Sequence, residues 1–125
     1  SGGPATGAAT VEDVDGLRCA SLLVDGELDS ARVVDVTDRL FAEQLGGDGI
    51  AVVLGRAAFA VKLGPTAQRA GLRAGDLVRA AAETMGGRGG GGPEFAQGAV
   101  KDPARRDQAL GLIREMVTRR AGAGR

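Results

Sequence analysis

The sequence predicts a single α/β domain in which helices cover a mixed β-sheet. The chain has 125 residues, which is enough for one hydrophobic core and too few for two. Short apolar runs typical of strands alternate with longer segments whose apolar residues recur every three to five positions, as in amphipathic helices. In chain order these segments predict roughly β-α-β-β-α-β-α, the pattern of a mixed sheet with helices packed on it.

The first predicted element is a buried strand at residues 17–24 (LRCASLLV). This apolar run lies between Asp15-Gly16 and Asp25-Gly26, two pairs that favour turns. It contains Cys19, the only cysteine, which we expect to pack as a small buried hydrophobe. One cysteine and no histidine exclude an internal disulfide and the usual zinc sites, and they fit a reducing cytosol.

An amphipathic helix is predicted at residues 30–45. Its apolar residues are spaced so that they share one helical face. Asp29 or Ser30 is available as the N-cap, and Gly46 lies just past the end.

The next segments predict a hairpin, a helix and a further strand. Residues 49–54 and 57–63 are strand-like, and the short connection between them favours an antiparallel hairpin. Residues 65–71 suit a single helical turn, and residues 72–85 show helical periodicity that ends at a glycine pair. Residues 95–100 are short and apolar enough for another strand.

The last predicted helix begins at Asp102-Pro103, an N-cap followed by proline at the first helical position. It continues to about Arg120 and ends at Ala121-Gly122. We therefore place the globular domain at residues 11–121, with residues 122–125 as a tail. Residues 1–10 are small and glycine-rich, as in a flexible lead-in from a neighbouring domain or a remnant of cloning.

Charge and hydropathy exclude several classes of function. The net charge is zero, so overall basicity does not indicate nucleic-acid binding. However, residues 1–54 carry a net charge of −7 and residues 55–125 carry +7, which attracts polyanions if the halves form different surfaces. No stretch approaches the roughly 20 apolar residues of a membrane span, and no signal peptide precedes the domain, so we expect a cytoplasmic location without a membrane partner.

A glycine-rich segment, residues 86–92 (GGRGGGG), is the candidate functional centre. Glycine accepts positive φ and close backbone approach, so such a segment can present several N–H groups to a phosphate or carboxylate. A P-loop requires Gly-Lys-Ser/Thr opening a helix, and a dinucleotide fingerprint must follow a strand, so neither motif fits here. A flexible linker and close packing of a helix on the sheet remain alternative explanations.

The residues beyond the glycines carry a family resemblance. Residues 86–98 (GGRGGGGPEFAQG) resemble the signature GGxGGGRPDMAQxGG of the C-terminal domain of alanyl-tRNA synthetase, which belongs to a wider family associated with DHH phosphoesterases. Similar residues upstream, at 14–16, 35–45 and 74–78, extend the resemblance over roughly residues 11–117. The matching positions of the signature are Gly86, Gly87, Gly89, Gly90, Gly91, Pro93, Ala96, Gln97 and Gly98.

This resemblance implies a tRNA-binding module without catalytic residues or a cofactor. In the family the domain engages the outer corner of tRNA, so the expected partners are tRNA, in particular tRNA-Ala, and the other domains of a parent alanine–tRNA ligase. Two departures bear on function, because Gly92 stands where the family has Arg or His, and Ala99 and Val100 replace glycines. The candidate tRNA- or anion-binding residues are Gly86, Gly87, Arg88, Gly89, Gly90, Gly91, Pro93, Gln97, Lys101, Arg105 and Arg106.

The basic residues after the glycines suit duplex RNA. Duplex RNA is contacted mainly through phosphates and 2′-hydroxyls, whereas the absence of Tyr and Trp argues against base stacking on single strands. Asp35 and Asp38 share a helical face, but nothing in the sequence activates them, and no metal or hydrolytic site is predicted. The alternative to RNA binding is a protein-interaction or oligomerisation module, such as a homodimer, on the same fold.

Overall fold

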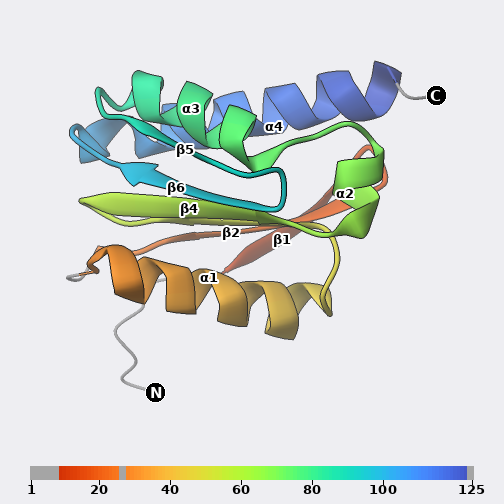
Figure 1. Cartoon of the computed structure of the whole chain (residues 1–125), viewed down its shortest axis with the longest axis horizontal. Helices are drawn as coiled ribbons and strands as arrows, with labels where there is room; N and C mark the ends of the chain where they lie inside the picture. The colour runs from red at the N-terminus through yellow and green to blue at the C-terminus, as the bar shows by residue number, and fades with distance from the viewer. Residues whose placement is uncertain (1–8, 26–27, 124–125) are drawn as a thin grey trace.

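A computed structural model describes residues 9–25 and 28–123, which form a sheet between two layers of helices. Helix α1 covers one face of the sheet, and α3 and α4 cover the other (Figure 1). The elements are β1 (Thr10–Val14), β2 (Leu17–Leu23), α1 (Ser30–Leu45), β3 (Ile50–Leu54), β4 (Ala58–Leu63), α2 (Pro65–Arg69), α3 (Ala74–Thr84), β5 (Gly89–Gly91), β6 (Phe95–Ala99), a 3-10 turn (Pro103–Arg105) and α4 (Arg106–Ala123). This confirms the predicted class, a mixed sheet covered by helices.

The six strands lie in the order β1-β2-β3-β4-β6-β5. Strands β2 and β3 are parallel, and all other neighbours are antiparallel. The parallel pair requires a crossover, which α1 supplies, whereas the hairpin β3–β4 needs only a short turn. The short strand β5 is left at one open edge of the sheet.

Side chains alternate between two apolar cores, one on each face of the sheet. Leu17 and Cys19 face α3 and α4, while Ala20 and Leu22 face α1. Cys19 is buried as expected, and desolvation raises the pKa of its thiol to about 11, so the thiol is neutral and unreactive near pH 7.

The bounds of α1 follow from its capping residues. The side chain of Asp29 accepts a hydrogen bond from the backbone N–H of Arg32 at 2.8 Å. At the other end Gly46 adopts φ +63°, and its N–H reaches the Ala42 carbonyl. Both caps, and the helix from Ser30 to Leu45, agree with the prediction.

Three elements differ from the prediction. Strand β1 precedes β2, and Asp15 and Gly16, with φ of +51° and +86°, form the tight turn between them. Strand β5 consists of three glycines, whose low strand propensity hid it. Helix α4 continues to Ala123, so Ala121-Gly122 does not end it.

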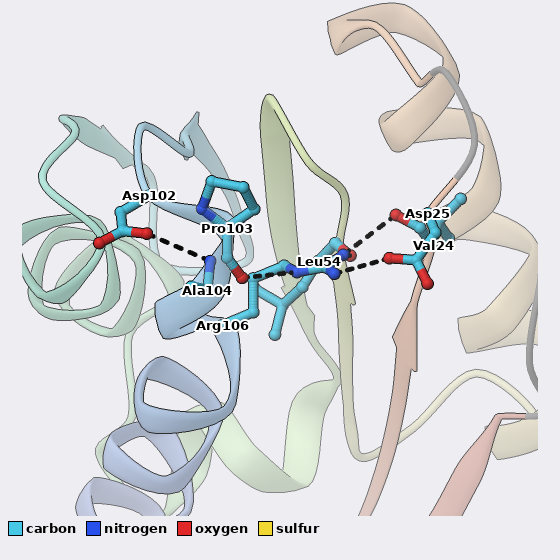
Figure 2. Close-up of polar contacts among 7 residues, drawn as sticks. All are labelled: Val24, Asp25, Leu54, Asp102, Pro103, Ala104 and Arg106. Carbon is cyan, nitrogen blue, oxygen red and sulfur yellow. Dashed lines mark hydrogen bonds and ion pairs between the residues drawn. The ribbon is translucent and has the colours of Figure 1, made fainter.

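Arg106 also differs from the prediction, because its side chain is buried and is not part of an exposed basic surface. Figure 2 shows its guanidinium at the carboxyl ends of β2 and β3, where it donates to the carbonyl oxygens of Val24 (3.1 Å) and Leu54 (3.3 Å) and to Asp25 Oδ1 (2.6 Å). The hydrogen bond from Arg106, followed by its charge, lowers the pKa of the Asp25 carboxyl. The guanidinium therefore joins α4 to two central strands.

We expect Arg106→Leu to lower the free energy of unfolding by about 2–4 kcal/mol, because it removes a buried charged donor from the strand carbonyls. Asp25→Asn should cost less, since the Asp25 side chain is 61% exposed. Urea unfolding followed by circular dichroism measures both. An Arg106→Leu chain as stable as the original would show that this contact does not hold α4 on the sheet.

Candidate functional site

The glycine-rich segment is an ordered part of the sheet. Strand β5 pairs with β6 in the register Gly89↔Gly98, Gly90↔Gln97 and Gly91↔Ala96. The ladder extends one pair further at each end, where Ala99 N–H donates to the Arg88 carbonyl (2.8 Å) and Gly92 N–H donates to the Phe95 carbonyl (3.0 Å). A flexible linker therefore does not describe this segment.

The first N–H groups of α3 bind the end of the same segment. Ala74 N–H donates to the Pro93 carbonyl at 3.0 Å, and Gly75 N–H donates to the Gly92 carbonyl at 2.9 Å. These are backbone donors that a helix start otherwise leaves unpaired. The glycine segment thus lies along α3 from its last turn to its first.

Several glycines of the signature are required by close packing. A Cβ on Gly89 would lie 2.6 Å from Val78 Cγ1 of α3, and a Cβ on Gly98 would lie 2.8 Å from the ring of Phe59. On the helix side, a Cβ on Gly75 would lie 2.6 Å from the Gly91 carbonyl oxygen. The packing alternative considered for the sequence therefore accounts for these positions.

Close packing does not require two other glycines of the segment, Gly90 and Gly92. A Cβ on Gly90 would meet nothing within 4 Å, and the nearest atom to a Cβ on Gly92 is the Phe95 carbonyl oxygen at 3.9 Å. Neither residue has the positive φ that would favour glycine. Both positions have space for a side chain, so internal packing does not explain why they are glycine.

Gly90 lies on the side of the sheet away from α3, beside an exposed glutamine. Because strand residues alternate, Phe95, Gln97 and Ala99 point to this side, while Ala96 lies in the core beneath α3. Helix α1 packs on β2, β3 and β4, which leaves β5 and β6 largely uncovered there. We call the surface formed by Arg88, Gly90, Phe95, Gln97 and Ala99 the ribbon face.

Gln97 is the polar centre of the ribbon face. Its side chain is exposed, and within the described residues its amide makes no hydrogen bond. An amide offers both a donor and an acceptor, which suits ribose hydroxyls, phosphates and base edges alike. Gly90, Phe95 and Ala99 of the ribbon face are half-buried, so the exposed Gln97 amide is its most accessible polar group beside the glycine backbone.

The candidate cations gather where the segment leaves α3. Lys101 N–H donates to the Met85 carbonyl at 3.2 Å, which places Lys101 beside Gly86, and Arg88 follows two residues later. Arg88 and Lys101 are exposed and form no ion pair within the described residues. Arg105 is also exposed and contacts Asp102 at 3.3 Å. We call Arg88, Lys101 and Arg105 the basic cluster.

The remaining candidates lie elsewhere or inside the fold. Pro93 is exposed at the opposite end of the ribbon face from the basic cluster, and Gly87 is held against the Ala99 carbonyl. Arg106 is bound to the ends of β2 and β3 and is separate from this surface. Phe95 is a further member of this surface, although its apolar side chain indicates only a strand in the sequence.

The acidic and basic halves of the chain supply helices to different faces. Helix α1 comes from the acidic half, and α3 and α4 come from the basic half. On α1, Asp35 pairs with Arg39 at 3.7 Å and Asp38 pairs with Lys62 at 2.9 Å, so both carboxylates have cationic neighbours. Over the described ranges, no group of three His, Cys, Asp or Glu side chains is placed to hold a metal ion.

A separate turn anchors α2 and is structural. The carboxylate of Asp48 accepts from the backbone N–H of Thr66 at 3.0 Å and from its hydroxyl at 2.5 Å. These hydrogen bonds lower the pKa of Asp48. Gly64 is needed beside it, because a Cβ there would overlap the Asp48 carboxylate.

Comparison with known proteins places the chain in a family. The DHHA1 domain model matches residues 28–119, and the chain therefore belongs to the DHHA1 domain family. Its sequence relatives include alanine–tRNA ligases: that of Thermus thermophilus is 42% identical over 108 residues, and that of Acidothermus cellulolyticus is 35% identical over 119 residues. These alignments cover 86% and 92% of this chain, which spans 12% and 13% of the length of these relatives.

Solved structures share the fold. The C-Ala domain from Aquifex aeolicus alanyl-tRNA synthetase matches with a TM-score of 0.76 at 18% identity, covering 87% of this chain and 98% of that one. The exonuclease RecJ bound to manganese matches with a TM-score of 0.62 at 19% identity, covering 86% of this chain and 25% of that one. At these identities the likeness shows the fold alone.

Within the described residues, no helix is long and apolar enough to cross a membrane.

A stability measurement distinguishes glycines that packing requires from glycines that it does not. We expect Gly89→Ala to lower the free energy of unfolding by about 1–3 kcal/mol, because the new methyl group overlaps Val78 and the backbone of Gly98. Gly90→Ala, one residue away, should change it by less than about 0.5 kcal/mol, since the space there is open. Equal losses in urea unfolding would contradict the assignment of Gly89 to packing and Gly90 to an exposed surface.

Proposed function

We propose that this chain is a non-catalytic tRNA-binding domain of an alanine–tRNA ligase and that it binds tRNA through the ribbon face and the basic cluster. The observation that carries the proposal is that packing does not require glycine at positions 90 and 92, and that Gly90 pairs with Gln97, whose amide makes no hydrogen bond within the described residues. Bare backbone at these two positions permits close approach of a ribose-phosphate chain.

The charges of the basic cluster support the same ligand. Arg88 and Lys101 lie at one end of the ribbon face with no internal counterion among the described residues. Phosphate contacts by such cations supply affinity, whereas Gln97 supplies a directional hydrogen bond. The resemblance to alanyl-tRNA synthetase makes tRNA-Ala the RNA to test first, with a cytoplasmic role in protein biosynthesis and the other domains of the ligase as partners.

A protein-interaction role is the second candidate, and strand β5 favours it. This three-residue strand lies at an open sheet edge, and Gly92 lacks the side chain that the family signature has there. An open edge can pair with a strand of another chain, including a second copy. Sedimentation velocity distinguishes the two candidates: a stable dimer that tRNA leaves unchanged supports the protein-interaction role.

Substitutions in the basic cluster test tRNA binding. We expect Arg88→Gln, Lys101→Gln and Arg105→Gln each to weaken binding of a tRNA-Ala transcript and to reduce the slope of log K against log salt by about 0.9. Fluorescence anisotropy at several salt concentrations measures both quantities. Arg32→Gln, which removes an exposed charge from α1, is the matched control and should change neither. Absence of binding by the original chain at low salt would refute the proposal.

Restoring the side chain of the family signature should strengthen binding. Gly92 is exposed and has open space around it, so Gly92→Arg should leave the free energy of unfolding unchanged within about 0.5 kcal/mol. The added guanidinium can reach a phosphate near Pro93, and we expect severalfold tighter tRNA binding with a steeper salt dependence. Gly92→Gln is the uncharged control, and an equal gain from both variants would argue against a phosphate contact.

A further inference from the structure

A second basic surface lies at the other end of α3. A groove of about 320 Å³ opens between the start of α3 and the last turns of α4. We call it the α3–α4 groove. Its lining residues are Gly71, Leu72, Arg73, Asp76, Leu77, Met116, Arg119 and Arg120. Three arginines and one aspartate, from two segments far apart in the sequence, thus line a single groove.

Two of these arginines have no anionic partner in the part of the chain that the structure describes. Within the described residues, neither Arg73 nor Arg120 forms an ion pair. The one acid among the lining residues, Asp76, lies 3.6 Å from Arg79 in a surface pair, and three arginines of the lining outnumber it. Arg119 contacts Glu115 at 3.4 Å, but both side chains are well exposed, and such surface pairs hold little energy. The groove therefore has an excess of positive charge.

The floor of the groove argues for an anion over an apolar partner. Leu72 and Leu77 are only 5% and 1% exposed, so they give a docking peptide few apolar atoms to cover. The exposed lining residues are Gly71, Asp76 and the three arginines, and Met116 is half-buried. Guanidinium groups bind phosphate by paired hydrogen bonds, which ammonium groups do not.

The side-chain stem of one arginine packs beside a glycine of the groove. Gly71 has φ +95°, and a Cβ there would lie 3.2 Å from Arg120 Cδ. The stem of Arg120 therefore lies directly against the bare Gly71 backbone.

The groove and the basic cluster lie at opposite ends of one helix. Helix α3 has 11 residues and is therefore about 16 Å long. Its last turn meets Lys101 and its first turn meets the groove, since α4 runs back along it. Domains that bind duplex RNA contact about 16 bp of it, which is longer than this separation, so phosphates of one RNA can reach both ends.

We propose that the α3–α4 groove binds a backbone phosphate of the same RNA through Arg73 and Arg120, as a second contact separate from the ribbon face. This inference rests on the proposed tRNA-binding function and extends it to the opposite end of α3. Binding at two points fixes the orientation of an RNA on the domain, which one basic cluster cannot do.

The test compares four double variants of the 125-residue chain in binding of a tRNA-Ala transcript over a range of salt concentrations. Arg73→Gln with Arg120→Gln should weaken binding at least tenfold at moderate salt and lower the log–log salt slope by about 0.9, because one phosphate contact is lost. Arg32→Gln with Arg39→Gln on α1 removes the same charge elsewhere and should change neither quantity. Arg73→Lys with Arg120→Lys keeps the charge and should restore the slope but only part of the affinity.

The outcomes separate this inference from the proposed function. If the glutamine pair binds with the original slope while Arg88→Gln with Lys101→Gln lowers it, the groove proposal is wrong and the proposed function stands. If the α1 control loses as much as the glutamine pair, the groove proposal also fails, because only total charge then matters. If the original chain binds no tRNA at low salt, both proposals are overturned. Circular dichroism melts of each variant exclude loss of folding as the cause.

Discussion

The close contact of α3 with the glycine segment is the constraint on which the functional surface depends. A methyl group on Gly75 of the helix would overlap the Gly91 carbonyl, and one on Gly89 of the strand would overlap the Val78 side chain of α3. The first N–H groups of α3 then bind the carbonyls of Gly92 and Pro93. A helix and an edge strand with little hydrophobic side chain between them are thereby fixed in one arrangement.

This contact also explains why the exposed side of the segment is bare. Packing requires glycine at the inward positions, but Gly90 and Gly92 point to open space. A ligand that binds the ribbon face can therefore contact the backbone of Gly90 and, beside it, the amide of Gln97. The same short helix separates the basic cluster from the α3–α4 groove, so the packing of α3 sets the distance between the two positively charged surfaces.

The shared fold does not by itself imply a shared activity. A synthetase C-Ala domain and a manganese-bound exonuclease superpose on this chain with TM-scores of 0.76 and 0.62. Function in such a family resides in the side chains and partner domains that each member adds to the fold. Here the distinguishing features are the exposed cations, the free Gln97 and the absence of a side chain at Gly92.

The sequence alone determined the α/β class, the bounds of α1, the β3–β4 hairpin and the family signature, because each depends on local periodicity, caps or fixed spacing. It did not reveal β5, since glycines become a strand only when β6 supplies the hydrogen bonds. Nor did it show that the adjacent residues Arg105 and Arg106 differ in exposure. Arg105 is exposed, whereas Arg106 donates to the carbonyls of Leu54 and Val24, 52 and 82 residues away. Long-range contacts of this kind decide which cations remain available to a partner, and only the tertiary structure contains them.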